Sequence, residues 1–169
     1  MSFEIAQNRG TYNRARRVRD ITELSNVRLT ALVARTDFPG GQPPESLRLR
    51  IKFTSKALPR KREGFSAQVR FDLTGSKGEK DSNKPLLDIR CSFHLDYSLP
   101  PDSAIKPSEI RAFAKSNAIF NGWPYFREIV QNTCARLGLS PPPVPLLKFK
   151  IVAPKQNGQK EIVHARRFP

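Results

Sequence analysis

The sequence contains few of the residue types on which secreted proteins and nucleophilic enzymes depend. It has two cysteines and two histidines among 169 residues. Cys91 and Cys134 have no CxxC neighbour and cannot form a disulfide framework, so we expect both to be small apolar core residues in a reducing compartment. His94 and His164 stand in no Ser–His or Cys–His signature. These scarcities argue against a disulfide-stabilised secreted domain and against nucleophilic catalysis.

Metal sites, phosphate-binding loops and membrane segments are also missing from the sequence. No set of His, Cys and carboxylate residues has the spacing of metal ligands, and the 75–78 segment is too short for a glycine-rich phosphate loop. No apolar run approaches the roughly 18 residues that span a bilayer. The N-terminal residues lack the apolar stretch of a secretory signal. We therefore expect a cytoplasmic protein with no enzyme activity, no cofactor, no metal and no membrane partner.

Acidic residues are scarce relative to basic ones. The chain has 30 Lys and Arg against 15 Asp and Glu, which gives a formal net charge of +15. A surplus of this size attracts polyanions and acidic protein surfaces. Five arginines fall in residues 9–19, which indicates a basic arm that is ordered only if another segment holds it. Nucleic acid and an acidic client protein are both open as partners.

The length of the chain suits one domain. Hydrophobic residues make up only 38% and there are 15 prolines, which predicts a modest core with long loops. We expect a basic arm over 1–20, a folded domain over 21–146, and a basic strand or tail over 147–169. The tail contains Asn157-Gly158, a strong hairpin turn signal, although a disordered basic end is the alternative.

Four segments alternate between apolar and polar residues with period two, which is typical of strands with one covered and one wet face. They span residues 22–35, 47–53, 65–73 and 86–99. In the first segment, the residues expected on one face are Val27, Leu29, Ala31 and Val33. The connections have no room for a crossover helix, so the simplest topology is a four-stranded antiparallel meander.

The polar face of this sheet is expected to be basic. Its cations would include Arg48, Arg50, Lys52 and Arg70. The strand aromatics all fall on the opposite, apolar face, so the polar face offers no platform on which bases could stack. This pattern weakens specific single-strand recognition and leaves loose phosphate binding possible.

A helical region follows the strands. Pro107 suits a first helical position, and Glu109 lies near the positive end of the helix dipole. Gly122 and Pro124 predict a break or kink, and Gly138 is a natural C-terminal cap. The expected fold is α+β, with a four-stranded antiparallel sheet covered on one face by a long kinked helix over 107–138.

An aromatic cluster and a proline-stiffened apolar segment lie at the kink and at the end of this helix. We expect the client-binding side chains among Trp123, Tyr125, Phe126, Leu139, Val144 and Leu146. Such a segment beside aromatic residues can form one wall of an apolar groove. The alternative is that these residues close the core between helix and sheet. Both interpretations can hold for different members of the set.

The same region resembles a known family. The stretches Asn117–Glu128 (NAIFNGWPYFRE) and Arg136–Leu146 (RLGLSPPPVPL) are similar to the helix motif and the Pro-Leu segment of SecB. SecB and its relatives are protein-export chaperones and chaperones associated with toxin–antitoxin pairs. The order of four strands and a long broken helix extends the resemblance to residues 22–146.

The resemblance implies an ATP-independent holdase that keeps unfolded polypeptides soluble in apolar grooves. It also implies that the sheets of two protomers pair and that the long helices join two dimers into a homotetramer. Export SecB is acidic, whereas this chain is basic, and residues 147–169 do not show the family's second helix. These departures favour a specialised chaperone with an antitoxin client. The alternatives are a general protein-export chaperone, a basic nucleic-acid-binding protein and a structural assembly subunit.

Overall fold

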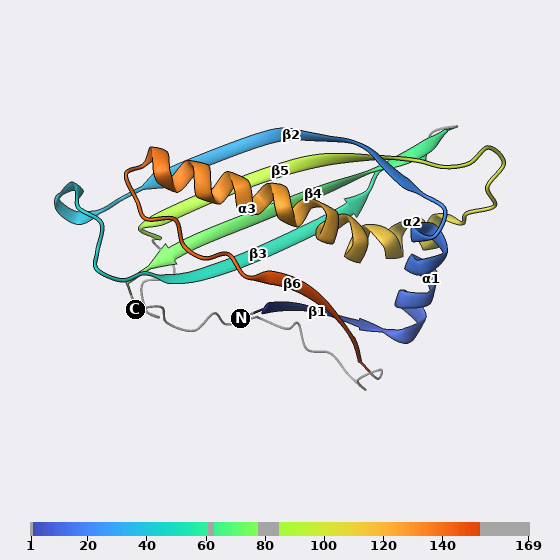
Figure 1. Ribbon diagram of the computed structural model, residues 1–169, viewed down its shortest axis with the longest axis horizontal. Helices are drawn as coiled ribbons and strands as arrows, with labels where there is room; N and C mark the ends of the chain where they lie inside the picture. The colour runs from blue at the N-terminus through green and yellow to red at the C-terminus, as the bar shows by residue number, and fades with distance from the viewer. Residues whose placement is uncertain (1, 61–62, 78–84, 153–169) are drawn as a thin grey trace.

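The computed structural model describes residues 2–60, 63–77 and 85–152 (Figure 1). The α+β fold predicted from the sequence is confirmed. The strands are β1 (Ser2–Asn8), β2 (Glu23–Thr36), β3 (Arg48–Ala57), β4 (Gly64–Ser76), β5 (Leu87–Ser98) and β6 (Leu146–Val152). The helical segments are α1 (Arg9–Arg19), the short η1 (Pro39–Gly41), α2 (Pro107–Phe113), η3 (Ala114–Ala118) and α3 (Ile119–Arg136).

The main sheet is four-stranded and antiparallel, but it is not a meander. Its strand order is β2-β5-β4-β3, so β2 pairs with β5, the last strand of this sheet, and not with β3, the next strand in the sequence. Strands β3, β4 and β5 follow one another as hairpins, and the 37–47 connection carries the chain from one edge of the sheet to the other. The strands are about 4.8 Å apart, so this connection easily crosses the sheet. The result is a Greek-key arrangement.

Strand β2 has two register shifts, between Leu24 and Asn26 and between Leu29 and Ala31, and the second divides the face predicted for it. Val27 and Leu29 pair with Leu95 and Phe93 on the apolar face, as expected. The register then shifts between Leu29 and Ala31, so that Ala31 pairs with Ser92 on the polar face. An extra residue in one strand reverses the facing of everything that follows it. The apolar row therefore consists of Leu24, Val27, Leu29, Leu32 and Ala34, and the predicted placement of Ala31 and Val33 is wrong.

Segments α2, η3 and α3 form one continuous helical layer across one face of the sheet (Figure 1). Pro107 begins α2, and Glu109 accepts a hydrogen bond from the Lys106 N–H at 2.9 Å, as in a capping box. The irregular turn is η3, a π-helical segment, and α3 then runs through Gly122 and Pro124. The predicted break at those two residues is thus placed too late, because π-helical insertion before α3 provides the irregularity.

Gly122 is a contact point between α3 and the sheet. A Cβ atom there would lie 3.2 Å from the Phe71 ring on β4. The absence of a side chain therefore lets the helix approach the strand closely, which is one of the recognised uses of glycine. Gly138 has a φ of 70° just beyond the end of α3, as the predicted cap requires.

The N-terminal segment and β6 form a second, smaller sheet. Strand β1 pairs in parallel with β6, from Ser2 opposite Leu146 to Asn8 opposite Val152. Asn8 then caps α1 by accepting a hydrogen bond from the Thr11 N–H at 2.8 Å. Helix α1 buries Ala15 and Val18 against α2 and η3. The basic arm is therefore ordered, because other segments hold it. Asn157-Gly158 and His164 lie outside the described residues.

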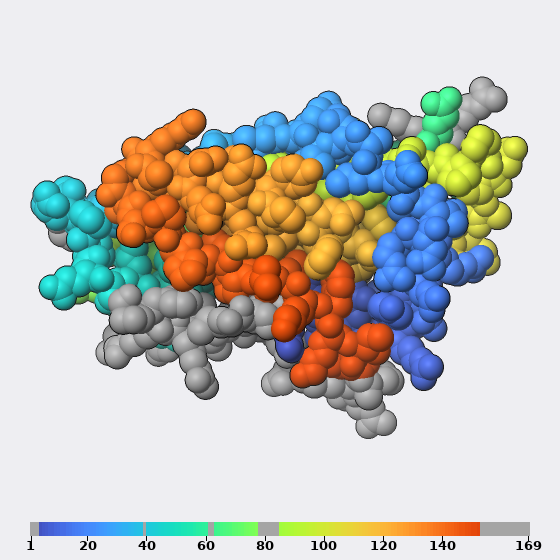
Figure 2. All heavy atoms as spheres, in the orientation of Figure 1, coloured from blue at the N-terminus to red at the C-terminus, as the bar shows by residue number. Residues whose placement is uncertain are grey.

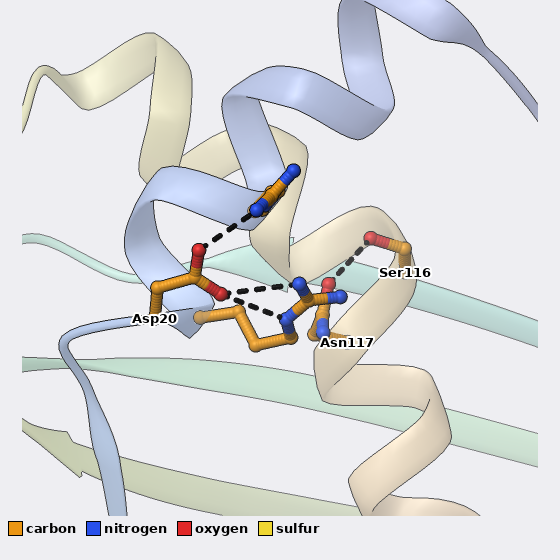
Figure 3. A network of polar contacts seen from close by, with 5 residues as sticks. Asp20, Ser116 and Asn117 are labelled. Carbon is orange, nitrogen blue, oxygen red and sulfur yellow. Dashed lines mark hydrogen bonds and ion pairs between the residues drawn. The ribbon is translucent and has the colours of Figure 1, made fainter.

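Ion pairs form at the C-terminal end of α1. The Asp20 carboxylate lies 3.2 Å from Arg16 Nε and 3.1 Å from Arg19 Nη2. Figure 3 shows these contacts beside η3, where the Ser116 hydroxyl lies 3.1 Å from the Asn117 side-chain oxygen. Arg16 and Arg19, two of the five arginines of the predicted basic arm, are thus paired with the residue that caps α1.

Candidate functional site

The structure separates the six predicted client-binding residues into buried and accessible ones. Trp123, Phe126 and Val144 are buried, with exposed fractions of 3%, 0% and 7%. Tyr125 and Leu146 are exposed, and Leu139 is half-buried. The expectation that different members serve the core and an open surface agrees with this division. A single open groove formed by all six does not.

The buried aromatics belong to the centre of the core. Phe126 stacks on Phe71 of β4 with ring centroids 4.8 Å apart, and Trp123 meets the same ring edge-on at 5.8 Å. Trp123 also donates a hydrogen bond from its indole N–H to the Pro145 carbonyl at 2.9 Å. Trp123 therefore fixes the proline-rich segment onto α3, and its indole is not available to a ligand.

The accessible residues do not share one surface. The Tyr125 ring leans over Phe93 of β5 at 6.2 Å, on the side of α3 that faces β2. Leu146 begins β6, which lies on the other side of α3 beside β1 (Figure 1). Leu139 lies beyond the C-terminal end of α3.

Leu139 lines a pocket between two proline-rich loops, which we call the loop pocket. The cavity has a volume of about 340 Å³. Its walls are residues 43–47 of the β2–β3 connection and residues 138–143 after α3, and its base includes Leu49, Leu87 and Cys134. Pocket volumes of a few hundred Å³ with mostly apolar walls are typical of ligand sites. The prolines lack backbone N–H donors, so the walls present carbon surface that cannot pair with neighbouring strands.

The first of these loops was not anticipated as part of a site. The sequence pattern places Pro43 and Pro44 in a connection and predicts that Leu47 and Leu49 belong to the strand over 47–53. A sequence signal for this loop was present, because Pro43-Pro44 lie close to Leu47 just as the prolines at 141–143 lie close to Leu139. The β2–β3 connection crosses the end of the sheet at which α3 ends, so the two loops line the same pocket (Figure 1).

A second accessible apolar surface runs along β2, and we call it the β2 strip. It consists of Leu24, Val27, Leu29 and Leu32, which share the face that α3 covers on the neighbouring strands. Leu29 is 45% exposed and Leu32 is 43% exposed. Figure 2 shows β2 uncovered beside α3. Within the described residues, β2 has a strand partner on one edge only.

Neither cysteine has the environment of a nucleophile. Both thiols are free and buried, as predicted. Burial raises the pKa of Cys91 to about 12, with a smaller contribution from Asp72, and burial also raises the pKa of Cys134. A thiol must ionise to attack or to bind a metal, so both side chains act as apolar packing groups.

The described residues contain no cluster of three or more His, Cys, Asp or Glu that could hold a metal ion. Among the helices of this part of the chain, none combines the length and the apolar composition needed to cross a bilayer. The accessible features are thus apolar surfaces and basic charge.

Comparisons with known proteins agree with this geometry. No family model and no curated protein matches the sequence. The structure is similar to that of the Mycobacterium tuberculosis SecB-like chaperone Rv1957 in complex with a ChAD peptide from the HigA1 antitoxin. The TM-score is 0.70 at 17% sequence identity, over 82% of this chain and 98% of that chain. A Streptococcus agalactiae protein of unknown function is similar at a TM-score of 0.41 and 9% identity, over 68% of this chain and 88% of that one.

The resemblance seen in residues 22–146 is therefore confirmed in three dimensions. The match covers nearly all of the Mycobacterium tuberculosis chain, and the four-stranded sheet with one long helical layer corresponds. At this sequence identity the likeness concerns the fold. The chain has the fold of a SecB-like chaperone.

Proposed function

We propose that this protein is an ATP-independent holdase of the cytoplasm that binds unfolded polypeptide in the loop pocket. The observation that carries the proposal is a cavity of about 340 Å³ with mostly apolar walls between two proline-stiffened loops, on a SecB-like fold. A holdase needs no reaction chemistry. It needs apolar surface that is open to a client and protected from pairing with itself.

The physical basis of client binding is apolar burial by several weak anchors. One client side chain buried against Leu47 and Leu139 contributes on the order of 1.5–3 kcal/mol. Further anchors on the same client chain raise the overall avidity without any single tight contact. Tyr125 and Leu146, both exposed, are proposed as such additional contacts.

We further propose that the client is an antitoxin with an aggregation-prone segment. The similar Mycobacterium tuberculosis chaperone was solved with an antitoxin peptide, which supports this choice over general export. The net charge of +15 adds a second reason, since a basic chaperone attracts an acidic client and repels a basic one.

The pocket can be tested by truncation and by filling. We expect Leu139→Ser to weaken suppression of aggregation about tenfold, because losing one buried anchor costs about 1.5 kcal/mol or more. Ser140→Trp should have a similar effect by occupying the cavity. The measurement is light scattering of a chemically denatured protein diluted into buffer with increasing chaperone.

Ile151→Ser is the matched control, because Ile151 is 53% exposed, lies outside the pocket and is not one of the proposed client contacts. It should lower suppression by less than either pocket variant. Circular dichroism and thermal unfolding would establish that all three variants fold. If both pocket variants suppress aggregation as well as the unchanged protein does, the loop pocket is not the client site.

We also propose that the protein self-associates through β2, as a dimer or a dimer of dimers. A long edge strand with an exposed apolar row is a template for pairing with another copy. The β2 strip provides both the free edge and the apolar contacts, since Leu29 and Leu32 are more than 40% exposed.

Introducing charge on the β2 strip should dissociate the assembly. We expect Leu29→Lys with Leu32→Lys to sediment as a monomer, while the unchanged protein sediments as a dimer or larger species. Asn13→Lys with Gln131→Lys adds the same charge at exposed positions elsewhere and should leave the mass unchanged. A monomeric unchanged protein, or a strip variant that keeps its mass, would exclude this interface.

A further inference from the structure

The face of the main sheet that points away from α3 has an unusual composition. On β3, β4 and β5, every residue on this face is polar. The side chains are Arg48, Arg50, Lys52, Thr54 and Lys56 on β3; Ser66, Gln68, Arg70, Asp72, Thr74 and Ser76 on β4; and Asp88, Arg90, Ser92, His94, Asp96 and Ser98 on β5. On these three strands no aromatic or aliphatic side chain interrupts it, whereas the neighbouring β2 adds Ala31 and Val33 to the same side of the sheet. We call this surface the basic face.

The acidic residues of the basic face are already paired on its inner strands. Arg90 Nη2 lies 2.6 Å from Asp88 Oδ2, and Arg70 Nε lies 2.9 Å from Asp72 Oδ1. Asp96 accepts a hydrogen bond from Ser66 at 2.6 Å and meets Arg28 at 3.4 Å. These contacts neutralise the centre of the sheet and leave its positive charge toward one edge.

The excess positive charge lies along β3. Arg50, Lys52 and Lys56 have no ion-pair partner among the described residues, and Lys52 and Lys56 are exposed. Residues two apart in a strand point to the same side about 6.6–6.8 Å from each other. Strand β3 therefore presents a linear array of cations beside the hydroxyls of Thr54 and Thr74.

We propose that the basic face binds the phosphate backbone of a nucleic-acid duplex, without sequence preference. Lys, Arg and hydroxyl side chains are the groups that contact phosphate oxygens, and such contacts alone provide non-specific affinity. This surface is separate from the loop pocket and the β2 strip, so the proposal does not depend on the holdase activity.

Two features favour a nucleic-acid duplex over other polyanions. Protein interfaces obtain their affinity from apolar and aromatic anchors at their centre, and the basic face has none. Single-stranded nucleic acid gains much of its affinity by stacking on aromatic rings, which this face also lacks. A duplex requires neither and has the highest linear density of phosphate charge.

Lysines on β3 have a second possible role, because charges on an edge strand prevent edge-to-edge aggregation. That role requires only that the charges be present. This role predicts that removing the charges increases self-association. It also predicts that removing them leaves the affinity for any ligand unchanged. A binding measurement on variants that lack these charges distinguishes the two roles.

The test compares two variants of equal charge by fluorescence anisotropy with a labelled 20-base-pair DNA duplex. The face variant is Arg50→Gln, Lys52→Gln and Lys56→Gln. The control is Arg9→Gln, Lys115→Gln and Lys148→Gln, which removes exposed cations from α1, η3 and β6. We expect the unchanged protein to bind with a slope of log K against log[salt] of about −3 to −5. The face variant should bind at least about tenfold more weakly, and its slope should be less negative by about 2–3 units.

An RNA duplex of equal length should bind comparably, because the phosphate backbone is shared, and a single strand of the same base count should bind more weakly. The proposal is overturned if the face variant binds like the unchanged protein, or if the control loses as much affinity. It is also overturned if polyglutamate displaces the duplex as effectively per charge, since an acidic polypeptide would then be the preferred ligand. Aggregation suppression by the face variant, measured alongside, reports separately on the holdase.

Discussion

The double substitution Trp123→Ala with Phe126→Ala is expected to abolish folding. Phe126 is fully buried, and its ring stacks on Phe71 and lies 5.3 Å from Trp123. Each aromatic-to-alanine change in a core costs about 3–5 kcal/mol through lost burial and the cavity that remains. The two sites are in contact, so the losses need not add, but their combination is comparable with the whole stability of a small domain, about 5–15 kcal/mol.

The measurement is equilibrium denaturation in urea followed by circular dichroism. Tyr125→Ala is the matched control, because this neighbouring aromatic is 38% exposed and should lower the free energy of unfolding by about 1 kcal/mol or less. A double variant that unfolds cooperatively within about 3 kcal/mol of the unchanged protein would contradict the central position of this aromatic cluster.

This result bears on how client binding can be studied. Before the fold is known, the same double substitution looks like a test of an aromatic binding surface. In the structure it removes the core, so any loss of chaperone activity would report unfolding. Substitutions at Leu139 and Ser140, on the wall of the loop pocket, avoid this difficulty.

The substitution Arg17→Met is expected to destabilise the protein by about 2–3 kcal/mol. Arg17 Nη1 lies 2.8 Å from the carboxylate of Glu109, and only 4% of the Glu109 side chain is exposed. Removing the arginine leaves a buried carboxylate without its counter-charge, and such losses are larger than the net value of the pair. The contact joins α1 to the start of α2, so the N-terminal helix should also become more accessible to proteases.

A mutant cycle separates the lost charge pair from lost packing. Adding Glu109→Gln to Arg17→Met removes the unpaired charge while the glutamine oxygen can still cap α2, so the double variant should recover about 1 kcal/mol. Arg14→Met, on an exposed residue of the same helix, should change stability by less than about 0.5 kcal/mol. If Arg14→Met and Arg17→Met have equal effects, the Glu109 pair does not hold α1 in place.

Local patterns in the sequence were sufficient to predict most of the elements. Period-two alternation located the four strands of the main sheet, because one face of each lies on the core and the other meets water. Pro107 and Gly138 marked the ends of the helical layer, since their backbone restrictions act within a few residues. The family resemblance in residues 117–146 then predicted the SecB-like fold.

Features that depend on contacts between distant segments could not be obtained in this way. The bulge in β2 reversed the facing of Ala31 and Val33 because its register is set by pairing with β5. Gly122 resembled a helix breaker, but the Phe71 ring, 51 residues earlier in the chain, explains its lack of a side chain. Trp123 and Phe126 have the composition of a binding surface, and only their packing shows that they are core.

The sequence by itself determined the class of the protein: a basic, α+β chain with half-buried strands, a capped helical layer and a SecB-like signature. Those properties arise from residue type and short-range spacing. The tertiary structure decided which apolar and charged residues remain accessible, namely the loop pocket, the β2 strip and the basic face. Accessibility depends on which strands are neighbours and on what each helix covers, and these contacts join residues far apart in the chain.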